Sequence, residues 1–265
     1  MGKKAIVQYM AFMSVVLTFV LAILTAMGLY GGHVSPVGNE LKAMLSFGLP
    51  FLIIANVIVF FYWLIRLRIW ALVPLVTVCC CWGYIGCVYQ LDSRPEGNAE
   101  QDGLTIASYN VEAFRLDKDG FYANEVKQLL AKNNADIVCF QEFNNFAGGT
   151  GIKVVDIYKD QYPYKIEGIG GQIIMSKYPI KKGEVIKFEF GGGTNSAQYA
   201  DIEVSGKFLR VYNVHFLTTR VNSLLSQTKD TEKGERAKIV INGWQDQQLY
   251  RSSQANELSN YIRMS

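Results

Sequence analysis

Three long apolar runs in the first third of the chain constrain its fold more than any other feature. They span residues 5–30, 44–65 and 69–89. Each run meets the roughly 20 residues that a helix needs to cross the hydrocarbon core of a bilayer. Lys3 and Lys4 before the first run would also suit a signal peptide, but the run exceeds an h-region of about 7 to 15 residues and lacks a clear small-x-small cleavage site. The sequence therefore predicts a membrane anchor of three transmembrane helices over residues 1–89.

The basic residues that flank these runs predict how the chain is oriented. Four of them fall on the same side of the membrane if all three runs cross it: Lys3, Lys4, Arg66 and Arg68. The loop at 31–43 on the other side has only Lys42, which Glu40 offsets. Cytoplasmic loops carry the excess of lysine and arginine. We therefore expect a multi-pass protein of the inner membrane whose residues after 90 lie on the outer, periplasmic side.

The rest of the chain differs in composition from this membrane part. Residues 1–89 hold only five of the 26 basic and one of the 23 acidic side chains. The remainder is therefore rich in charge but nearly neutral, which argues against a strong electrostatic footprint for long nucleic acids. Residues 90–103 are polar and contain Pro95 and Gly97, so we expect them to form a linker to a soluble domain over residues 104–265.

The soluble part begins with a pattern of strand, helix and strand. Residues 104–110 and 136–142 have the composition of strands, and residues 123–134 place apolar side chains on one face of a helix. Such a unit predicts two parallel strands joined by a crossover, whose carboxyl ends meet at one edge of the sheet. Asn110 and Glu142 should both lie at that edge. We expect five further strands and a final helix, near residues 164–167, 172–176, 184–190, 198–204, 207–214 and 235–263.

A glutamate at the end of a buried strand has two explanations. Mg²⁺ takes hard oxygen ligands, usually one or two carboxylates with waters and a substrate phosphate, and Glu142 would supply one ligand at a rigid point. Asn110 could then hold a metal-bound water or the carboxylate itself. On spacing alone, a glutamate that closes the strand and faces water is the preferred interpretation. The metal site remains a hypothesis at this point.

Four segments, in this order, resemble the endonuclease/exonuclease/phosphatase family. They are SYNV (108–111), DIVCFQE (136–142), QIIMSKYPI (172–180) and RVYNVHF (210–216). The resemblance covers about residues 104–263, and DNase I-like members of this family hydrolyse phosphate esters with Mg²⁺. It implies an α+β chain, in which the three-helix anchor is followed by part of a four-layer α/β sandwich. The anchor is similar to that of membrane-bound bacterial members.

The resemblance also implies roles for individual residues. Glu142 matches the metal-ligand glutamate of the family, with Mg²⁺ as the expected ion and Mn²⁺ as an alternative. Asn110 matches the active-site asparagine of the first strand. His215 matches the histidine that contacts the scissile phosphate, although without the resemblance a hydrogen-bonded core position would be the preferred interpretation of a lone histidine. Glu112 falls where many members have a second acidic residue near the metal, and a solvent-facing role fits it as well.

Two family motifs are missing from the sequence. An Asp-x-Asn strand motif and a terminal Asp-His pair should follow His215, and neither occurs there. The resemblance therefore implies a domain that is incomplete at its C-terminus, with apolar strand faces and edges left uncovered and no activity in the chain as given. We expect a membrane-anchored Mg²⁺-dependent phosphoesterase in the full-length form. The alternative is a non-catalytic membrane or interaction protein that carries a degenerate half-domain.

The partners of the chain are only partly readable from its sequence. The expected substrate is a phosphate ester, but lipid, small-molecule and nucleic-acid esters all remain open, because the loops that select among them cannot be decoded from one sequence. The membrane tether and the nearly neutral domain favour a lipid or a small phosphate ester. No protein partner is readable.

Overall fold

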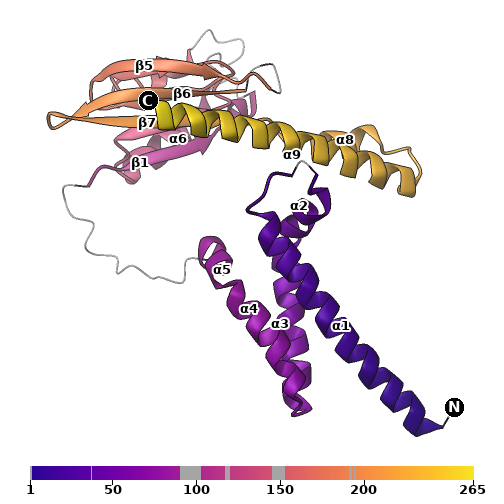
Figure 1. The fold of residues 1–265 in the computed structure, drawn as a ribbon. Helices are drawn as coiled ribbons and strands as arrows, with labels where there is room; N and C mark the ends of the chain where they lie inside the picture. The colour runs from indigo at the N-terminus through magenta and orange to yellow at the C-terminus, as the bar shows by residue number, and fades with distance from the viewer. Residues whose placement is uncertain are drawn as a thin grey trace. The chain divides into compact units, whose positions relative to one another are not determined.

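A computed structural model describes residues 2–36, 38–89, 103–116, 120–144, 153–190, 193 and 195–265 (Figure 1). The chain divides into two compact units, Met1–Glu96 and Gly97–Ser265, and each is treated separately. Nearly all of the expected linker at 90–103 lies outside the described residues, which resume at Gly103.

The first unit is helical, as the apolar runs predict. Its helices are α1 (Lys3–Gly31), α2 (Glu40–Phe47), α3 (Leu49–Ile65), the 3₁₀ helix η1 (Ile69–Ala71), α4 (Leu72–Cys80) and α5 (Trp82–Val88). The second run is broken between α2 and α3, which meet at 67°. Gly48 lies at the break and Pro50 follows in the first turn of α3, where the missing N–H cannot continue the hydrogen bonds of α2.

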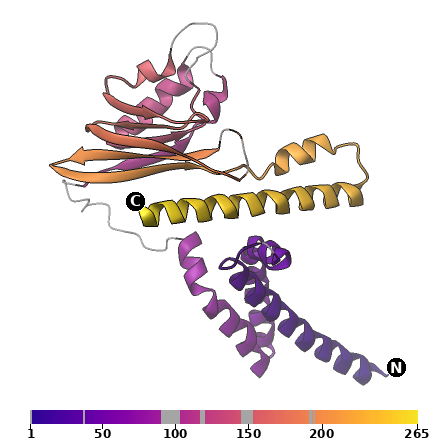
Figure 2. The same ribbon diagram turned by 45° about the horizontal axis from the view of Figure 1, so that its top comes forward.

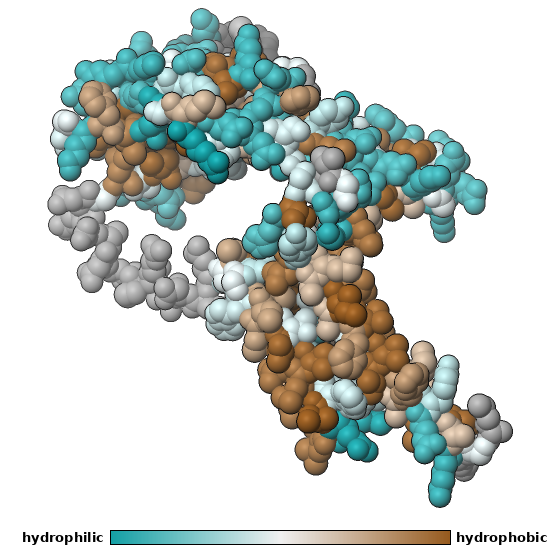
Figure 3. All heavy atoms as spheres, viewed as in Figure 1, coloured by the Kyte–Doolittle hydropathy of each residue, from teal (hydrophilic) through white to brown (hydrophobic). Residues whose placement is uncertain are grey.

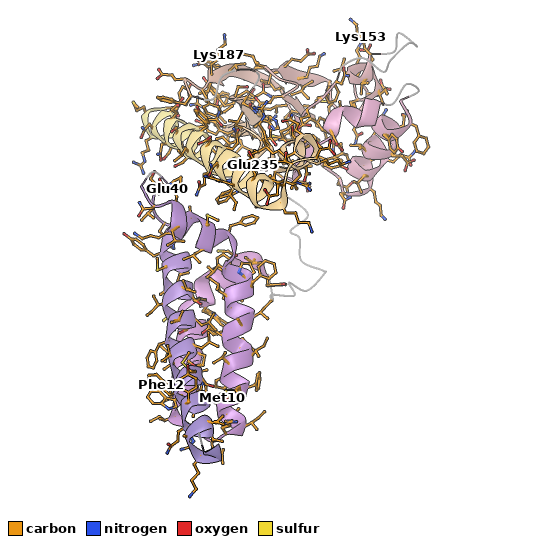
Figure 4. All side chains as sticks on the ribbon, turned by 90° about the vertical axis from the view of Figure 1, so that its right-hand side faces the viewer. Met10, Phe12, Glu40, Lys153, Lys187 and Glu235 are labelled. Atoms are coloured by element: carbon orange, nitrogen blue, oxygen red, sulfur yellow. The ribbon has the colours of Figure 1, made fainter. Side chains whose placement is uncertain are left out.

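By length and composition, α1 is the one described helix that can cross a membrane alone. The pair α2 and α3, and the stretch from η1 to α5 with its bend of 51°, qualify only when each is taken as one broken span or a re-entrant loop. The three-span anchor therefore stays a prediction. Apolar side chains cover much of the outer surface of these helices (Figure 3), and Met10 and Phe12 of α1 are exposed (Figure 4).

Polar contacts and small residues hold the helices of the first unit together. Trp63 Nε1 donates a hydrogen bond to Thr18 Oγ1 at 2.8 Å, and Asn56 Nδ2 donates one to Thr25 Oγ1 at 2.8 Å, so both bonds join α3 to α1. Gly31 has no room for a side chain, since a Cβ there would collide with the backbone carbonyl of Lys42 in α2. Small residues and interhelical hydrogen bonds are typical of helix packing in membranes.

The second unit starts with the predicted parallel pair. Strand β1 (Ile106–Asn110) pairs in parallel with β2 (Ile137–Gln141), and helix α6 (Phe121–Lys132) lies in the connection after the 3₁₀ helix η2 (Glu112–Leu116). After the short helix α7 (Val154–Ile157), strands β3 (Tyr164–Glu167) and β4 (Ile173–Ser176) complete a sheet in the order β1-β2-β4-β3. The prediction of two parallel strands with a crossover is confirmed.

A second sheet follows, in which all neighbours are antiparallel. It consists of β5 (Ile180–Lys187), β6 (Ser196–Val204) and β7 (Lys207–His215). The chain then forms α8 (Val221–Gln227) and the long helix α9 (Lys233–Met264). Strand β5 begins four residues before the predicted strand at 184–190, and α8 was not predicted.

The two sheets pack face to face between helices (Figure 2). Alternate residues of β2 and β6 point to opposite faces, which divides the core into three clusters. The cluster between the sheets contains Ile137, Cys139, Ile174, Ala200, Ile202 and Val211. The outer face of the first sheet packs against α6 and α7 through residues such as Phe140 and Leu130. The outer face of the second sheet packs against α9, where Tyr199 meets Leu258.

The order of helices, sheet, sheet and helix confirms the predicted DNase I-like sandwich, in which the described residues form four strands of one sheet and three of the other. Helix α9 covers part of the outer face of the second sheet and runs on past its strands toward α8 (Figures 1 and 2). The edge strands β1 and β7 still expose apolar side chains, among them Ile106, Tyr109 and Phe208.

Candidate active site

The parallel pairing of β1 and β2 brings two of the predicted site residues together. Asn110 pairs with Gln141, the last residue of β2, so its side chain lies close to Glu142, which follows directly. Asn110 Nδ2 donates a hydrogen bond to Glu142 Oε1 at 2.9 Å. Glu142 has φ of 54°, a left-handed conformation that costs a residue with a side chain roughly 1–2 kcal/mol. This turn takes the chain out of the sheet and leaves the carboxylate at its edge.

The third predicted residue arrives from the other sheet. His215 is the last residue of β7, and its Nε2 lies 3.5 Å from Glu142 Oε1. The histidine side chain is mostly buried, whereas 42% of the Glu142 side chain is exposed. One carboxylate oxygen of Glu142 therefore faces both an amide donor from the first sheet and an imidazole from the second.

A buried hydrogen-bond network beneath the site joins the two sheets. Gln141 Nε2 donates to Asn213 Oδ1 at 2.6 Å, and Asn213 Nδ2 donates to the carbonyl oxygens of Phe140 at 2.8 Å and Ile173 at 3.2 Å. Gln141 precedes Glu142, and Asn213 lies two residues before His215 on the same strand. The network therefore holds the two strand ends that carry the site. Its sequence signal was a single amide side chain in each of the two strands.

The fourth predicted residue supports the site through its backbone. The Glu112 N–H donates to Asn110 Oδ1 at 3.0 Å, and the Ala113 N–H donates to the Glu142 carbonyl at 2.8 Å. Glu112, Ala113 and Phe114 all have positive φ, so this strained turn wraps around the end of β1. The Glu112 side chain is exposed and does not line the pocket described next. Its role as a metal ligand stays a prediction.

An open cavity of about 390 Å³ lies over these residues. Its lining is formed by Ser108, Asn110, Gln141, Glu142, Val214, His215, Phe216, Thr218 and Arg251. Three predicted site residues thus share one pocket with two groups that the sequence did not single out, Thr218 and Arg251. Both follow His215 in the chain, but Arg251 belongs to α9, and no local pattern placed that helix beside the pocket.

Helix α9 holds the segment that follows His215. The Leu217 N–H donates to Gln254 Oε1 at 3.0 Å, and Arg251 NH1 donates to the Leu217 carbonyl at 2.9 Å. Gln254 is fully buried, and its Nε2 also donates to the Phe190 carbonyl at 3.0 Å. Both backbone groups of Leu217 are therefore bound by α9, which positions the wall of the pocket next to His215.

The donor set of the pocket fits a hard cation that keeps most of its waters. Glu142 supplies a partly exposed carboxylate, whose Oε1 is oriented by Asn110. Within the part of the chain that the structure describes, no group of three or more His, Cys, Asp or Glu side chains gathers to hold a metal. Mg²⁺ is commonly bound by one or two carboxylates together with waters and substrate phosphate, so one carboxylate at a strand end is sufficient for such a site.

The two packed sheets, with Asn110, Glu142 and His215 at one open edge, define a DNase I-like α/β sandwich. The chain belongs to the Endonuclease/Exonuclease/phosphatase family, whose family model matches residues 107–254. Residues 10–88 match a second family model, described as a domain of unknown function (DUF8431). No curated protein matches the chain.

Several solved structures are similar to the chain at low identity. A double mutant of beta toxin from Staphylococcus aureus with bound magnesium ions is 24% identical, covers 50% of this chain and 59% of that one, and has a TM-score of 0.34. Humanized TDP2 of D. rerio is 22% identical over 48% and 53%, with a TM-score of 0.36. Sphingomyelinase C from Streptomyces griseocarneus is 18% identical over 50% and 57%, with a TM-score of 0.31. The chain spans less than two thirds of each.

Proposed function

We propose that this protein is a membrane-anchored phosphoesterase that requires a divalent cation, Mg²⁺ or alternatively Mn²⁺. The observation that carries the proposal is the convergence of Glu142, Asn110 and His215 on one open pocket, from two sheets and three strand ends. Membership of a family named for nucleases and phosphatases supports hydrolysis of a phosphate ester.

Each residue has a separate task in the proposed mechanism. Glu142 would hold the cation, and Asn110 orients the carboxylate by donating to its Oε1. The chemistry that Mg²⁺ supplies when bound is neutralisation of charge on the phosphoryl oxygens and the leaving group. His215 lies within reach of the same space and would donate Nε2–H to a phosphoryl oxygen. The bond between Gln141 and Asn213 keeps these strand ends in place.

The first unit is proposed to cross the membrane three times, with the second unit on the outer side. The apolar outer surface of the helices supports insertion, and the excess of basic residues at one end of the runs supports the orientation. Reporter fusions after residue 100 test it. Alkaline phosphatase should be active there and a reporter that works only in the cytoplasm should be inactive, whereas the reverse pattern would overturn this topology.

The substrate is proposed to be a lipid or a small phosphate ester. The support is the weak net charge outside the membrane part and the covalent link to apolar helices. A long nucleic acid is disfavoured, because its phosphates are usually met by a clearly basic surface.

The experiment that tests the cation site is the replacement of Glu142 by glutamine in the complete chain in detergent. Mn²⁺ binding, followed by electron paramagnetic resonance, should weaken at least about tenfold, because the amide keeps the shape of the ligand and loses its charge. Glu235→Gln, an exposed glutamate on α9, is the matched control and should bind Mn²⁺ like the wild type. Equal Mn²⁺ binding by both variants, or none by the wild type, would refute the proposal.

A further inference from the structure

Arg251 enters the pocket from α9, 36 positions after His215 in the sequence. Among the described residues that line the cavity with Glu142 and His215, it is the one with a permanently cationic side chain. Its side chain is partly buried. The pocket therefore contains a permanent positive charge in addition to its carboxylate, and this charge has no part in the mechanism derived above.

The guanidinium of Arg251 has more N–H donors than the one hydrogen bond to Leu217 uses. One nitrogen, NH1, donates to the Leu217 carbonyl at 2.9 Å. Among the residues that the structure describes, no carboxylate lies within ion-pair distance of it. Arg210 of the same unit provides a contrast, since both oxygens of Asp201 accept from it at 2.6 and 2.8 Å. A guanidinium has five N–H donors in a planar fork that matches phosphate geometry.

Holding the Leu217 segment does not explain why this residue is charged. Gln254, which is neutral, binds the other backbone group of Leu217 and the Phe190 carbonyl as well. Another neutral donor at position 251 would suffice for the Leu217 carbonyl. A partly buried charge without a counter-charge is unfavourable, and an anion in the pocket would compensate it.

We propose that Arg251 is the anion-binding residue of this pocket and holds a phosphate oxygen of the substrate. The proposal rests on the proposed function, because it requires a phosphate ester in the same pocket. Arg251 would act as a point of recognition for the phosphate group, distinct from the carboxylate of Glu142 that holds the cation. It would therefore affect substrate affinity and leave cation affinity unchanged.

The test measures binding of inorganic phosphate to the complete chain in detergent with Mg²⁺ present, by ³¹P nuclear magnetic resonance. A hydrogen bond to a charged group contributes about 1.5–3 kcal/mol, so Arg251→Gln should weaken phosphate binding by roughly 10- to 100-fold. Arg251→Lys keeps the charge but loses the planar fork of donors, so its affinity for phosphate should lie between those of the wild type and Arg251→Gln. Arg263→Gln, an exposed arginine near the end of the same helix, is the matched control and should bind like the wild type.

A second variant separates recognition from support of the pocket wall. Gln254→Leu removes the hydrogen bonds to Leu217 and Phe190 but leaves the charge of Arg251 in place. It should weaken phosphate binding less than Arg251→Gln does. Equal losses in the two variants would show that Arg251 acts through the wall, and unchanged binding in Arg251→Gln would also overturn the proposal.

Mn²⁺ binding, measured on the same variants, distinguishes this proposal from the proposed function. Arg251→Gln should bind Mn²⁺ like the wild type, whereas Glu142→Gln should not. If the wild type binds Mn²⁺ through Glu142 but no inorganic phosphate, the role of Arg251 is refuted and the cation site stands. If Arg251→Gln loses Mn²⁺ binding, the separate role proposed for this residue is wrong.

Discussion

Two buried amide side chains face each other across β6 and β7. Replacing each by an apolar side chain should change the stability of the fold in opposite directions. Asn213 and Gln198 are direct partners in the strand register, with 1% and 0% of their surfaces exposed. Asn213 takes part in three hydrogen bonds, with Gln141, Phe140 and Ile173. Neither amide atom of Gln198 has a hydrogen-bond partner among the described residues.

The expected magnitudes follow from these partners. Asn213→Leu loses three hydrogen bonds at about 1 kcal/mol each, and the buried leucine regains about 1 kcal/mol by the hydrophobic effect. The free energy of unfolding should therefore fall by about 2 kcal/mol. Gln198→Met removes two unpaired polar atoms and keeps the volume. This variant should be neutral or more stable by about 1 kcal/mol, because burying an unpaired polar group is itself unfavourable.

Cys139 offers a readout that is specific to the second unit. It is the lone cysteine after residue 90, it is buried between the sheets, and burial raises the pKa of its thiol to about 12. Its alkylation therefore requires the unit to open. Labelling of the complete chain, quantified on the Cys139 peptide by mass spectrometry, should be about 30-fold faster in Asn213→Leu than in the wild type, since 1.4 kcal/mol is a factor of ten. Labelling of Gln198→Met should be no faster than in the wild type.

Two results would refute this reasoning. Equal labelling rates in the two variants would mean that the Asn213 bonds contribute nothing beyond burial. If Gln198→Met were labelled ten times faster than the wild type, the Gln198 amide would have to make a stabilising interaction, contrary to its unpaired state among the described residues.

Two further predictions concern other parts of the molecule. The hydrogen bonds from Arg210 hold the pKa of Asp201 below its usual value, so this pair should stabilise the fold above about pH 4 and lose its effect as the pH falls through the lowered pKa. Asp201→Asn should cost about 1 kcal/mol at pH 7 and less as the pH falls below about 4, and an equal shift in melting temperature at pH 7 and pH 2 would contradict it. In the first unit, the bond between Trp63 and Thr18 should contribute about 1 kcal/mol. A double-mutant cycle of Trp63→Phe and Thr18→Val, followed by unfolding in dodecyl sulfate, should measure it, and a coupling of zero would show that the bond does not form.

Local sequence patterns determined most of the elements and part of the site. Apolar runs are visible as uninterrupted stretches, and the helices of the first unit follow them, although Gly48 and Pro50 break the second run in a way that length alone did not reveal. The pattern around 104–142 was sufficient to place Asn110 beside Glu142, because parallel strands with a crossover always end on the same edge of a sheet. That inference needs only the order of the elements.

Contacts between the sheets, and between a sheet and α9, were decided by tertiary packing. His215 reaches Glu142 only because the two sheets pack face to face, which joins residues 73 positions apart. Gln141 and Asn213 are single amides on strands 72 positions apart, and only the packing of the sheets makes each the hydrogen-bond partner of the other. Arg251 had no local signal at all, since a charged residue on a long polar helix is ordinarily exposed. Periodicity specifies which face of an element is apolar, but the element that covers this face is selected by the shape and volume of the whole core.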